Sequence, residues 1–236
     1  MTDAETRVCV LTGAAGGIGR ATYTALTEDG WSVVAVDRRT DDELPLKTCD
    51  ITRLQDVRRL VSDVTERFGR VDALVNAAGA GTPVAFEDAS DETWLRLFDT
   101  NLFGTVRICR EFLPLLRKSE WGYPSIVNFT SQAAKTGGLL IGAPYSAAKA
   151  AVLCLTMSLA AELGPEGIRV NAVAPGIIET AFLDGVPSIR DRGAGIPLRR
   201  IGRPGEVAEV VKFLISPSAS YLTGETVDVN GGIYMD

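Results

Sequence analysis

The sequence predicts an α/β fold in which a doubly wound parallel β-sheet lies between two layers of helices. Short runs of β-branched and other apolar residues alternate with longer amphipathic stretches, as in a parallel sheet that helices cover on both faces. A glycine-rich turn joins the first apolar run to the first helical stretch, which is where such three-layer folds bind phosphate groups.

The expected strands and helices alternate along the chain. Short β-branched or apolar runs predict strands at residues 8–11, 33–36, 71–75, 126–129, 170–173 and 226–229. Stretches of helical length predict helices at residues 18–28, 54–68, 101–117, 144–163 and 206–214. Gly30, Gly69 and Gly164 follow three of these helices, and glycine is common just after a helix C-terminus.

Residues 1–236 are expected to form one domain, because no linker or repeat interrupts the alternation. The segment from about residue 177 to residue 204 is rich in glycine and proline, which is typical of a lid over an active site. Its side chains include Phe182, Leu183, Val186, Arg190, Arg192, Arg199 and Arg200. These arginines can bind an acidic substrate group, but solvated surface charge is the favoured interpretation.

Composition excludes several classes of protein. The chain contains no histidine, so Ser-His-Asp hydrolysis and HExxH zinc sites are excluded. The four cysteines form no CxxC pair, and no metal site is expected. A net charge of −6 gives no reason to expect a nucleic-acid partner. The N-terminal residues have no apolar segment and residues 150–161 are too few to cross a bilayer, so a cytoplasmic protein without a membrane partner is expected.

The glycine-rich turn, residues 12–19, reads TGAAGGIG. The N–H groups and dipole of a helix N-terminus attract anions, and glycine lets a pyrophosphate approach the backbone because it lacks a Cβ. The position between a strand and a helix therefore predicts a Rossmann-like dinucleotide site. Its residues are expected to be Gly13, Gly16, Gly17, Ile18 and Gly19.

Asp37 stands at the end of the second expected strand. A carboxylate there accepts hydrogen bonds from the adenosine ribose hydroxyls and repels a 2′-phosphate, so NAD is predicted as the cofactor and NADP is disfavoured. Arg38 and Arg39 keep the NADP alternative open, since arginine is the side chain that pairs with a 2′-phosphate.

Tyr145 and Lys149 lie four residues apart on one face of an expected helix that is otherwise mostly apolar. Tyrosine titrates near pH 10, and an ammonium together with a nicotinamide cation favours its phenolate. The pair predicts acid–base chemistry without histidine, in which the phenolate accepts the proton of an alcohol while hydride passes to the cofactor. A surface pair is the alternative interpretation of this common spacing.

These motifs, in this order, resemble those of the short-chain dehydrogenase/reductase superfamily in its compact single-domain form, over essentially the whole chain. Other segments are similar to further family motifs, among them NAAG at residues 76–79 and PGIIET at residues 175–180. The resemblance implies that the dinucleotide also contacts Arg38, Asp50, Ile51, Asn76, Ala77, Ala78, Gly79, Tyr145, Lys149, Pro175, Gly176, Ile178 and Thr180.

The resemblance also implies four catalytic residues. Tyr145 is the general acid/base, and Lys149 binds the nicotinamide ribose and lowers the pKa of Tyr145. Ser131 hydrogen-bonds the substrate oxygen, and Asn101 holds a water that links Lys149 to solvent. Taken singly, Ser131 has the alternative interpretation of a strand-end hydroxyl, and Asn101 that of a helix N-cap.

The spacing between Ser131 and Tyr145 departs from the family pattern. It is 14 positions, one more than is common in the family, and the loop of residues 132–144 is expected to absorb the extra residue. Thr130 is the less favoured substitute for Ser131.

The sequence therefore predicts an NAD(H)-dependent oxidoreductase that interconverts a secondary alcohol and a ketone. The alternative is an NADPH-dependent 3-oxoacyl-type ketoreductase, and a non-catalytic dinucleotide-binding protein is less favoured. The expected helix at residues 144–163 is apolar on nearly all sides, which is more than one sheet covers. Since the family commonly forms tetramers through the matching helices, a homotetramer is predicted, with a dimer next.

Overall fold

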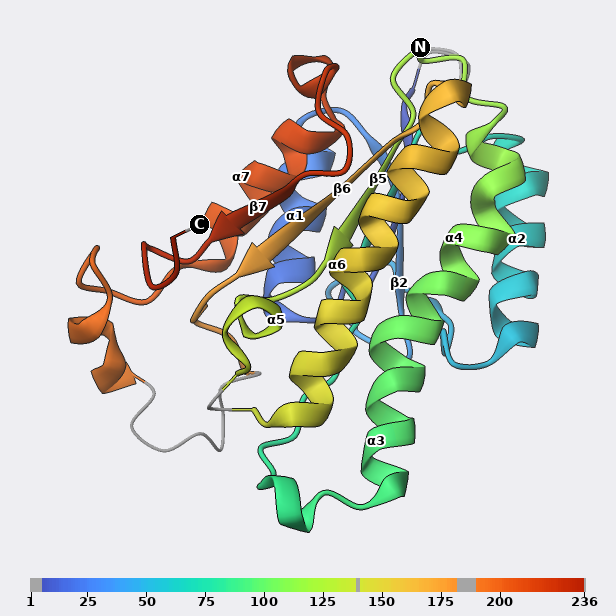
Figure 1. The fold of residues 1–236 in the computed structure, drawn as a ribbon. Helices are drawn as coiled ribbons and strands as arrows, with labels where there is room; N and C mark the ends of the chain where they lie inside the picture. Colours follow the sequence, from blue (N-terminus) through green and yellow to red (C-terminus); the bar gives the residue numbers. More distant parts are fainter. Residues whose placement is uncertain (1–5, 139–140, 182–189, 236) are drawn as a thin grey trace.

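The computed structural model describes residues 6–138, 141–181 and 190–235. Within these residues it confirms the three-layer α/β prediction, with one parallel sheet in the strand order β3-β2-β1-β4-β5-β6-β7 (Figure 1). The strands are β1 Val8–Thr12, β2 Ser32–Asp37, β3 Lys47–Thr48, β4 Ala73–Asn76, β5 Ser125–Phe129, β6 Arg169–Pro175 and β7 Thr226–Val229. The strand order changes direction between β1 and β4: β2 and β3 are added on one side of β1, and β4 to β7 on the other. Ligands of open α/β sheets bind at the carboxyl ends of the strands at such a point.

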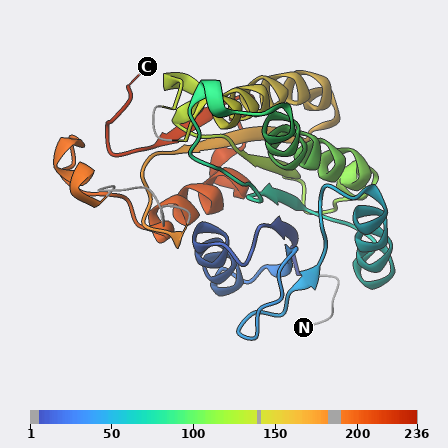
Figure 2. The same cartoon turned by 90° about the horizontal axis from the view of Figure 1, so that it is seen from below.

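Helices cover both faces of the sheet (Figure 2). On one face lie α2 Leu54–Phe68, α4 Gly104–Leu116 and α6 Ala143–Leu163, and on the other α1 Gly17–Glu28 and α7 Pro204–Ile215. Phe112 of α4 is fully buried in the first layer of the core, and Leu214 of α7 is fully buried in the second. Because both faces are covered, the central strands consist mostly of buried apolar residues rather than alternating with polar ones.

Among the strands and α-helices of the described residues, three short elements were not predicted from the sequence: β3, α3 Asp91–Phe98 and α5 Ala133–Thr136. β3 consists of two exposed residues that pair with the end of β2, so it offers no apolar run. α3 does show helix-start signals, since Ser90 Oγ accepts a hydrogen bond from Thr93 N and two acidic residues occupy the first turn.

The prediction that a helix begins at residue 101 is wrong. α3 continues through a π-helical turn, Asp99–Phe103, directly into α4, so Asn101 lies inside a longer helical run and is not its N-cap. Figure 1 shows α3 and α4 as one continuous, bent helical run. π-Helical turns often mark functional sites because the extra residue changes which side chains face inward.

α6 is apolar over a longer stretch than residues 150–161. Together with the turn that follows it, α6 forms a helical segment, Ala143–Glu166, that is long and apolar enough to cross a membrane by length and composition alone. The sequence had predicted no apolar stretch of that length. Of an 18-residue apolar stretch within this range, 33% is buried within the chain. The inner face packs on the sheet and includes the buried Lys149, whereas Cys154 and Met157 are exposed on the outer face.

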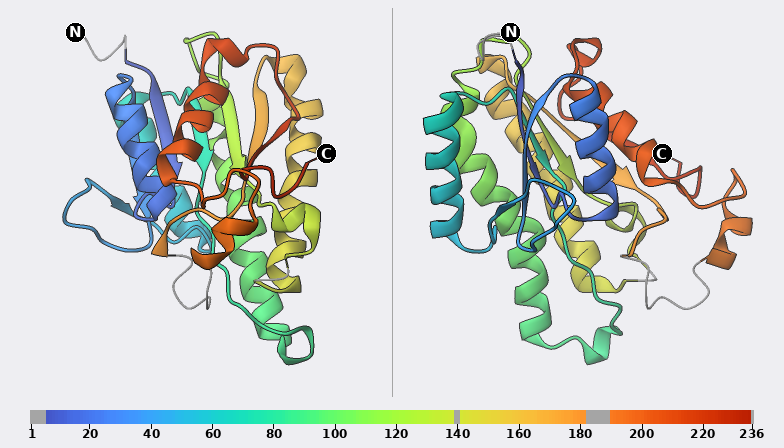
Figure 3. Two further views of the ribbon diagram at one scale, coloured as in Figure 1. Left: turned by 90° about the vertical axis from the view of Figure 1, so that its left-hand side faces the viewer. Right: turned by 180° about the vertical axis from the view of Figure 1, so that it is seen from behind.

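The predicted lid is described in part. Phe182, Leu183 and Val186 lie outside the described residues. The described part lies beside the C-terminal segment (Figure 3), where Leu198 N donates to Gly231 O at 3.2 Å.

Two arginines of the predicted lid bind other groups of the same chain. Arg199 Nη1 donates to Ala194 O at 2.7 Å, and Arg200 forms an ion pair of 2.6 Å with Glu206. These contacts favour the surface-charge interpretation for both side chains.

Candidate active site

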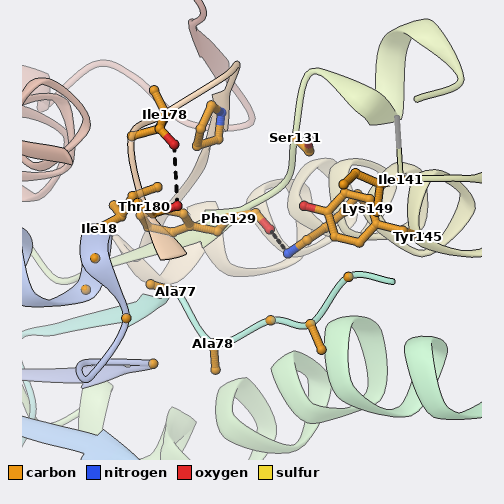
Figure 4. Close-up of a pocket in the computed structure, with 18 of the residues that line it drawn as sticks. Ile18, Ala77, Ala78, Phe129, Ser131, Ile141, Tyr145, Lys149, Ile178 and Thr180 are labelled. Carbon is orange, nitrogen blue, oxygen red and sulfur yellow. Dashed lines mark hydrogen bonds between the residues drawn. The ribbon is translucent and has the colours of Figure 1, made fainter. Parts of the chain in front are cut away.

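A cavity of about 1070 Å³ opens at the carboxyl ends of the strands. Every residue predicted to form the site lines this cavity except Asn76 and Asn101. The lining comes from the segments after β1, β2, β4, β5 and β6 and from α6, so the parallel sheet brings together residues that are far apart in the sequence. Figure 4 shows Ser131, Tyr145 and Lys149 on one side of this cavity and Ile178 with Thr180 on another.

The glycine-rich turn has the geometry of a phosphate cradle. Gly13 has a φ of +72°, and a Cβ there would lie 2.6 Å from the backbone nitrogen of Ala78. A Cβ at Gly19 would lie 2.1 Å from the carbonyl oxygen of Gly13. Neither a side-chain cap nor a first-turn acidic residue occupies the N-terminus of α1. The turn therefore fits the pyrophosphate of a dinucleotide.

Acidic side chains lie where the adenosine half of a dinucleotide would bind. Asp37 is 8% exposed; its Oδ2 accepts a hydrogen bond from Ala15 N at 3.1 Å, and its Oδ1 accepts one from Arg39 N at 3.0 Å. Arg38 is exposed beside it in the cavity wall. For Asp50, burial favours a raised pKa, but hydrogen bonds from Thr52 and the charges of Arg53 and Arg38 together lower the pKa of this carboxyl.

Tyr145 and Lys149 of α6 are both buried. Lys149 Nζ donates a hydrogen bond of 2.7 Å to Phe129 O and lies 5.9 Å from the centroid of the Tyr145 ring. Burial lowers the pKa of Lys149 to about 8. Burial raises the pKa of Tyr145 to about 12, while hydrogen bonding with Ser131 acts in the opposite direction. The protein side chains alone therefore raise the pKa of Tyr145, whereas the sequence predicts a lowered one. The reason is that desolvation outweighs the hydrogen bonding with Ser131.

Ser131 is the hydroxyl that faces the reaction centre. It lines the cavity at the end of β5, and its Oγ accepts a hydrogen bond from Ala133 N at 3.1 Å. The hydroxyl of Thr130 instead donates to Lys149 O at 2.8 Å and is committed to the backbone. α5 lies in the loop that was expected to absorb the extra residue before Tyr145.

Asn101 is fully buried behind the cavity. Its Nδ2 donates to Leu97 O and Ala80 O, both at 2.8 Å, and its Oδ1 accepts from Ala80 N at 3.2 Å. A Cβ at Gly79 would lie 2.9 Å from Asn101 Oδ1 and 3.4 Å from Lys149 Nζ. The side chain thus fastens the segment after β4 to the π-helical turn, and the water that the resemblance implies stays a prediction.

Asn76 also points away from the cavity. Its Nδ2 donates to Asn128 Oδ1 at 2.9 Å and to Cys109 Sγ at 3.3 Å. These bonds connect β4 to β5 and to α4, so the structure gives this side chain a packing role, whereas Ala77, Ala78 and Gly79 do line the cavity.

Sequence reasoning missed several cavity residues, among them Gln132, Ile141, Ile196 and Ile233. The first two lie between Ser131 and Tyr145, so the position of that loop between two site residues was a usable signal. The other two come from the lid and the C-terminal segment, where no motif marks them.

The fold, the phosphate cradle and the Tyr–Lys pair define the class of oxidoreductases that use a nicotinamide dinucleotide. The profile of the family described as enoyl-(acyl carrier protein) reductase matches residues 13–234. The chain belongs to the short-chain dehydrogenase/reductase family, which confirms the resemblance found in the sequence.

Individual relatives cover nearly the full chain. The 3-oxoacyl-[acyl-carrier-protein] reductase of Thermotoga maritima is 35% identical over 248 residues, 97% of this chain and 98% of the relative. A Brucella melitensis structure described as a glucose/ribitol dehydrogenase of this family is 37% identical with a TM-score of 0.89, covering 98% of this chain and 97% of its own. The 3-ketoacyl-(acyl-carrier-protein) reductase of Brucella melitensis complexed with NADH is 32% identical with a TM-score of 0.87, covering 96% of this chain and 97% of its own.

Proposed function

We propose that the protein is an NAD(H)-dependent oxidoreductase that interconverts a secondary alcohol and a ketone. The observation that supports this cofactor is the Asp37 carboxylate, which lies in the cavity wall at the end of β2. A buried negative charge there suits ribose hydroxyls and opposes a 2′-phosphate. The NADH bound to the Brucella ketoacyl reductase is in line with this choice.

The residues of this chain divide the chemistry between them. A bound nicotinamide dinucleotide supplies the hydride acceptor or donor. Tyr145 exchanges a proton with the substrate oxygen at its phenolic oxygen, and Ser131 orients that oxygen by hydrogen bonding. Since burial raises the pKa of Tyr145 to about 12, the phenol keeps its proton at neutral pH. A positive charge nearby is needed to lower this pKa, so that Tyr145 can exchange the proton with the substrate oxygen.

Lys149 contributes both position and charge. Its pKa of about 8 leaves the ammonium mostly protonated at neutral pH. The hydrogen bond to Phe129 O holds this charge between the end of β5 and α6, within reach of ribose hydroxyls and of Tyr145. Ala77, Ala78 and Gly79 would hold the dinucleotide from the β4 side.

An NADPH-dependent 3-oxoacyl-type ketoreductase is the second candidate. Arg38 favours it, because its exposed side chain lines the cavity next to Asp37, where a 2′-phosphate would lie. The Thermotoga relative is named as a 3-oxoacyl reductase. Fluorescence titration with NADH and NADPH tests the choice: at least tenfold tighter NADH binding is expected, and the reverse order favours the second candidate.

We also propose a homotetramer, with a dimer as the next candidate. Phe103 is 48% exposed just before α4 and Met157 is 47% exposed on α6, on the face that the sheet does not cover. Exposed apolar patches on helices mark contact surfaces. Light scattering should give four times the 25.1 kDa subunit mass, and the mass of one subunit would contradict assembly.

A cytoplasmic location remains part of the proposal. Cys9, Cys49 and Cys109 are buried free thiols, which suits a reducing compartment. Fractionation of the source cells, with the chain followed by antibody, tests this location.

A further inference from the structure

Lys135 of α5 forms an ion pair with Asp228 of β7, the strand at one edge of the sheet. Its Nζ lies 2.6 Å from Asp228 Oδ2 and 5.3 Å from the centroid of the Tyr234 ring. The side chains of Lys135 and Asp228 are only 12% and 16% exposed. Neither residue lines the cavity. The pair therefore joins α5 to the C-terminal part of the chain from outside the site described above.

α5 is a single helical turn, Ala133–Thr136, in the segment between Ser131 and Tyr145. A helix of four residues does not hold its place by itself, so contacts with the rest of the fold must fix it. Gly137 ends it in the left-handed conformation at a φ of +82°, and Gly138 follows at +61°. Because glycine restricts the backbone little, the position of α5 depends on the contacts of its own residues.

The first residue of α5 contributes to the reaction centre. Ala133 N donates a hydrogen bond of 3.1 Å to Ser131 Oγ, and Ala133 belongs to the same buried cluster as Tyr145. A serine oxygen that accepts from a fixed N–H keeps its own hydrogen available for another acceptor. The direction in which Ser131 can offer this hydrogen to the substrate oxygen therefore depends on where α5 holds the N–H of Ala133.

The end of β6 fixes the chain just before α5, because Gln132 N donates to Pro175 O at 3.0 Å. One fixed point leaves a helical turn able to rotate about it. Lys135 supplies a second fixed point on the same sheet, since Asp228 lies in β7 and pairs in register with Ala174 of β6. The ion pair thus sets the orientation of α5 relative to the strand ends that surround the cavity.

The attraction between these two charges is stronger than that of a surface pair, because both side chains are largely removed from water. Among the described residues, nothing donates a hydrogen bond to the other oxygen of Asp228, Oδ1. Removing one partner of such a pair leaves the other charge uncompensated, and the segment around it must rearrange. Loss of either charge is therefore expected to shift α5.

We infer that Lys135 is a positioning residue for the proposed reaction: its ion pair with Asp228 fixes α5, and α5 orients the Ser131 hydroxyl towards the substrate oxygen. Lys135 lines no part of the cavity and acts through Ser131. It should therefore affect kcat and leave the binding of the dinucleotide unchanged. This inference rests on the proposed function and adds to it a residue outside the cavity.

Lys135→Met removes the charge and keeps most of the length of the side chain. The assay uses the ketone that the wild type reduces fastest, with NADH or NADPH, among 2-butanone, cyclohexanone and ethyl acetoacetate. The kcat should fall about tenfold, because a displaced hydroxyl no longer meets the substrate oxygen. The Kd for NADH, from fluorescence titration, should stay within about twofold, since the cradle after β1 is a distant site. Asp228→Asn should reproduce both results, and it carries the test where Lys135→Met does not fold.

The Ser131→Ala background separates positioning from general damage to the structure. There, Lys135→Met should lower kcat by less than about twofold further, because the hydroxyl that it positions is already absent. A further loss of about tenfold would overturn the inference, since Lys135 would then act by another route. Weaker NADH binding in Lys135→Met and Asp228→Asn would overturn it in favour of a cofactor role, and so would an unchanged kcat in both.

Another lysine that pairs with a carboxylate provides the matched control. Lys212 lies 2.7 Å from Glu209 on α7, and neither residue lines the cavity. Lys212→Met should therefore leave both kcat and the Kd for NADH unchanged. An equal loss of kcat in Lys212→Met and Lys135→Met would show that the loss does not depend on α5, which would overturn the inference.

The outcome for the proposed function is read separately. Turnover of any alcohol or ketone that Tyr145→Phe abolishes upholds the proposed function, even where Lys135→Met and Asp228→Asn change nothing and the positioning role is disproved. A chain that binds NADH but turns over none of the alcohols, ketones, hydroxy acids and acyl thioesters tried contradicts the proposed function, and the role of Lys135 falls with it.

Discussion

The Nζ atom of Lys149 lies 2.7 Å from the carbonyl oxygen of Phe129, the last residue of β5. A second bond, from Thr130 Oγ1 to Lys149 O at 2.8 Å, joins the same two segments. These contacts fix α6, which holds Tyr145, against the strand end that holds Ser131. Lys149 is therefore a structural link between the two halves of the reaction centre as well as its positive charge.

Replacing Lys149 by methionine should change how stability depends on pH. Burial lowers the pKa of Lys149 from 10.5 to about 8, so at this side chain the unfolded chain binds more protons between these values, and the contribution of Lys149 to stability grows as pH rises. This contribution is up to about 3 kcal/mol, is complete above about pH 10.5, and is lost progressively as pH falls from there to about 8. Urea unfolding between about pH 7.5 and 9.5, below the titration of free tyrosine, checks it. Burial also raises the pKa of the thiols of Cys9, Cys49 and Cys109, which lowers the stability of every variant at the upper end of this range, so the Lys149 effect is the difference between two curves. The wild type should gain stability relative to Lys149→Met as pH rises, and the exposed-site control Lys118→Met should run parallel to the wild type. Parallel curves for wild type and Lys149→Met would contradict the buried ammonium.

Tyr145→Phe should lower kcat by about 10²- to 10⁴-fold, since the phenolic oxygen is the proposed proton carrier. NADH binding should persist, because the ring remains and the cradle after β1 is untouched. Steady-state kinetics and NADH fluorescence together check both statements. Tyr123→Phe, at a partly exposed tyrosine outside the cavity, is the control, and full turnover by Tyr145→Phe would rule out the mechanism.

Gly19→Ala should damage both stability and cofactor binding. The new Cβ would lie 2.1 Å from Gly13 O, so the turn must move, at a cost of about 1–3 kcal/mol. NADH binding should weaken by at least tenfold because the cradle is displaced. A Cβ at Gly205, in the first turn of α7, meets nothing within 4 Å, so Gly205→Ala should lose nothing. Normal NADH affinity in Gly19→Ala would show that the turn does not hold the pyrophosphate.

The central strands could be predicted because their physical cause is local. A strand covered on both faces is expected to be mostly apolar, and β1 and β4 show this in the sequence itself. β3 could not be predicted, since two exposed residues such as Lys47 and Thr48 pair with β2 only when the fold already exists.

The site was predictable where backbone geometry dictates residue type. Glycine is required in the turn after β1 because neighbouring backbone atoms leave no room for a Cβ. The four-residue spacing of Tyr145 and Lys149 follows from the helical repeat, which places both on one face. Asn101 and Gln132 are different, because a π-helical turn sets the surroundings of the first and a tertiary contact with Pro175 fixes the second. Neither relationship has a signature in the neighbouring sequence.

Asp37→Asn should shift the ratio of NADPH to NADH affinity at least about tenfold towards NADPH. The substitution keeps the shape of the side chain and one acceptor oxygen while removing the negative charge. Two unit charges about 4 Å apart interact by about 1 kcal/mol in water and about 4 kcal/mol near a protein surface, so relief of repulsion from a 2′-phosphate is large enough to produce this change. Fluorescence titration of both cofactors measures it, with the exposed Asp42→Asn as control. An unchanged ratio of NADH to NADPH affinity would show that the charge of Asp37 does not set cofactor choice, and the exposed guanidinium of Arg38 would then be the side chain to remove next.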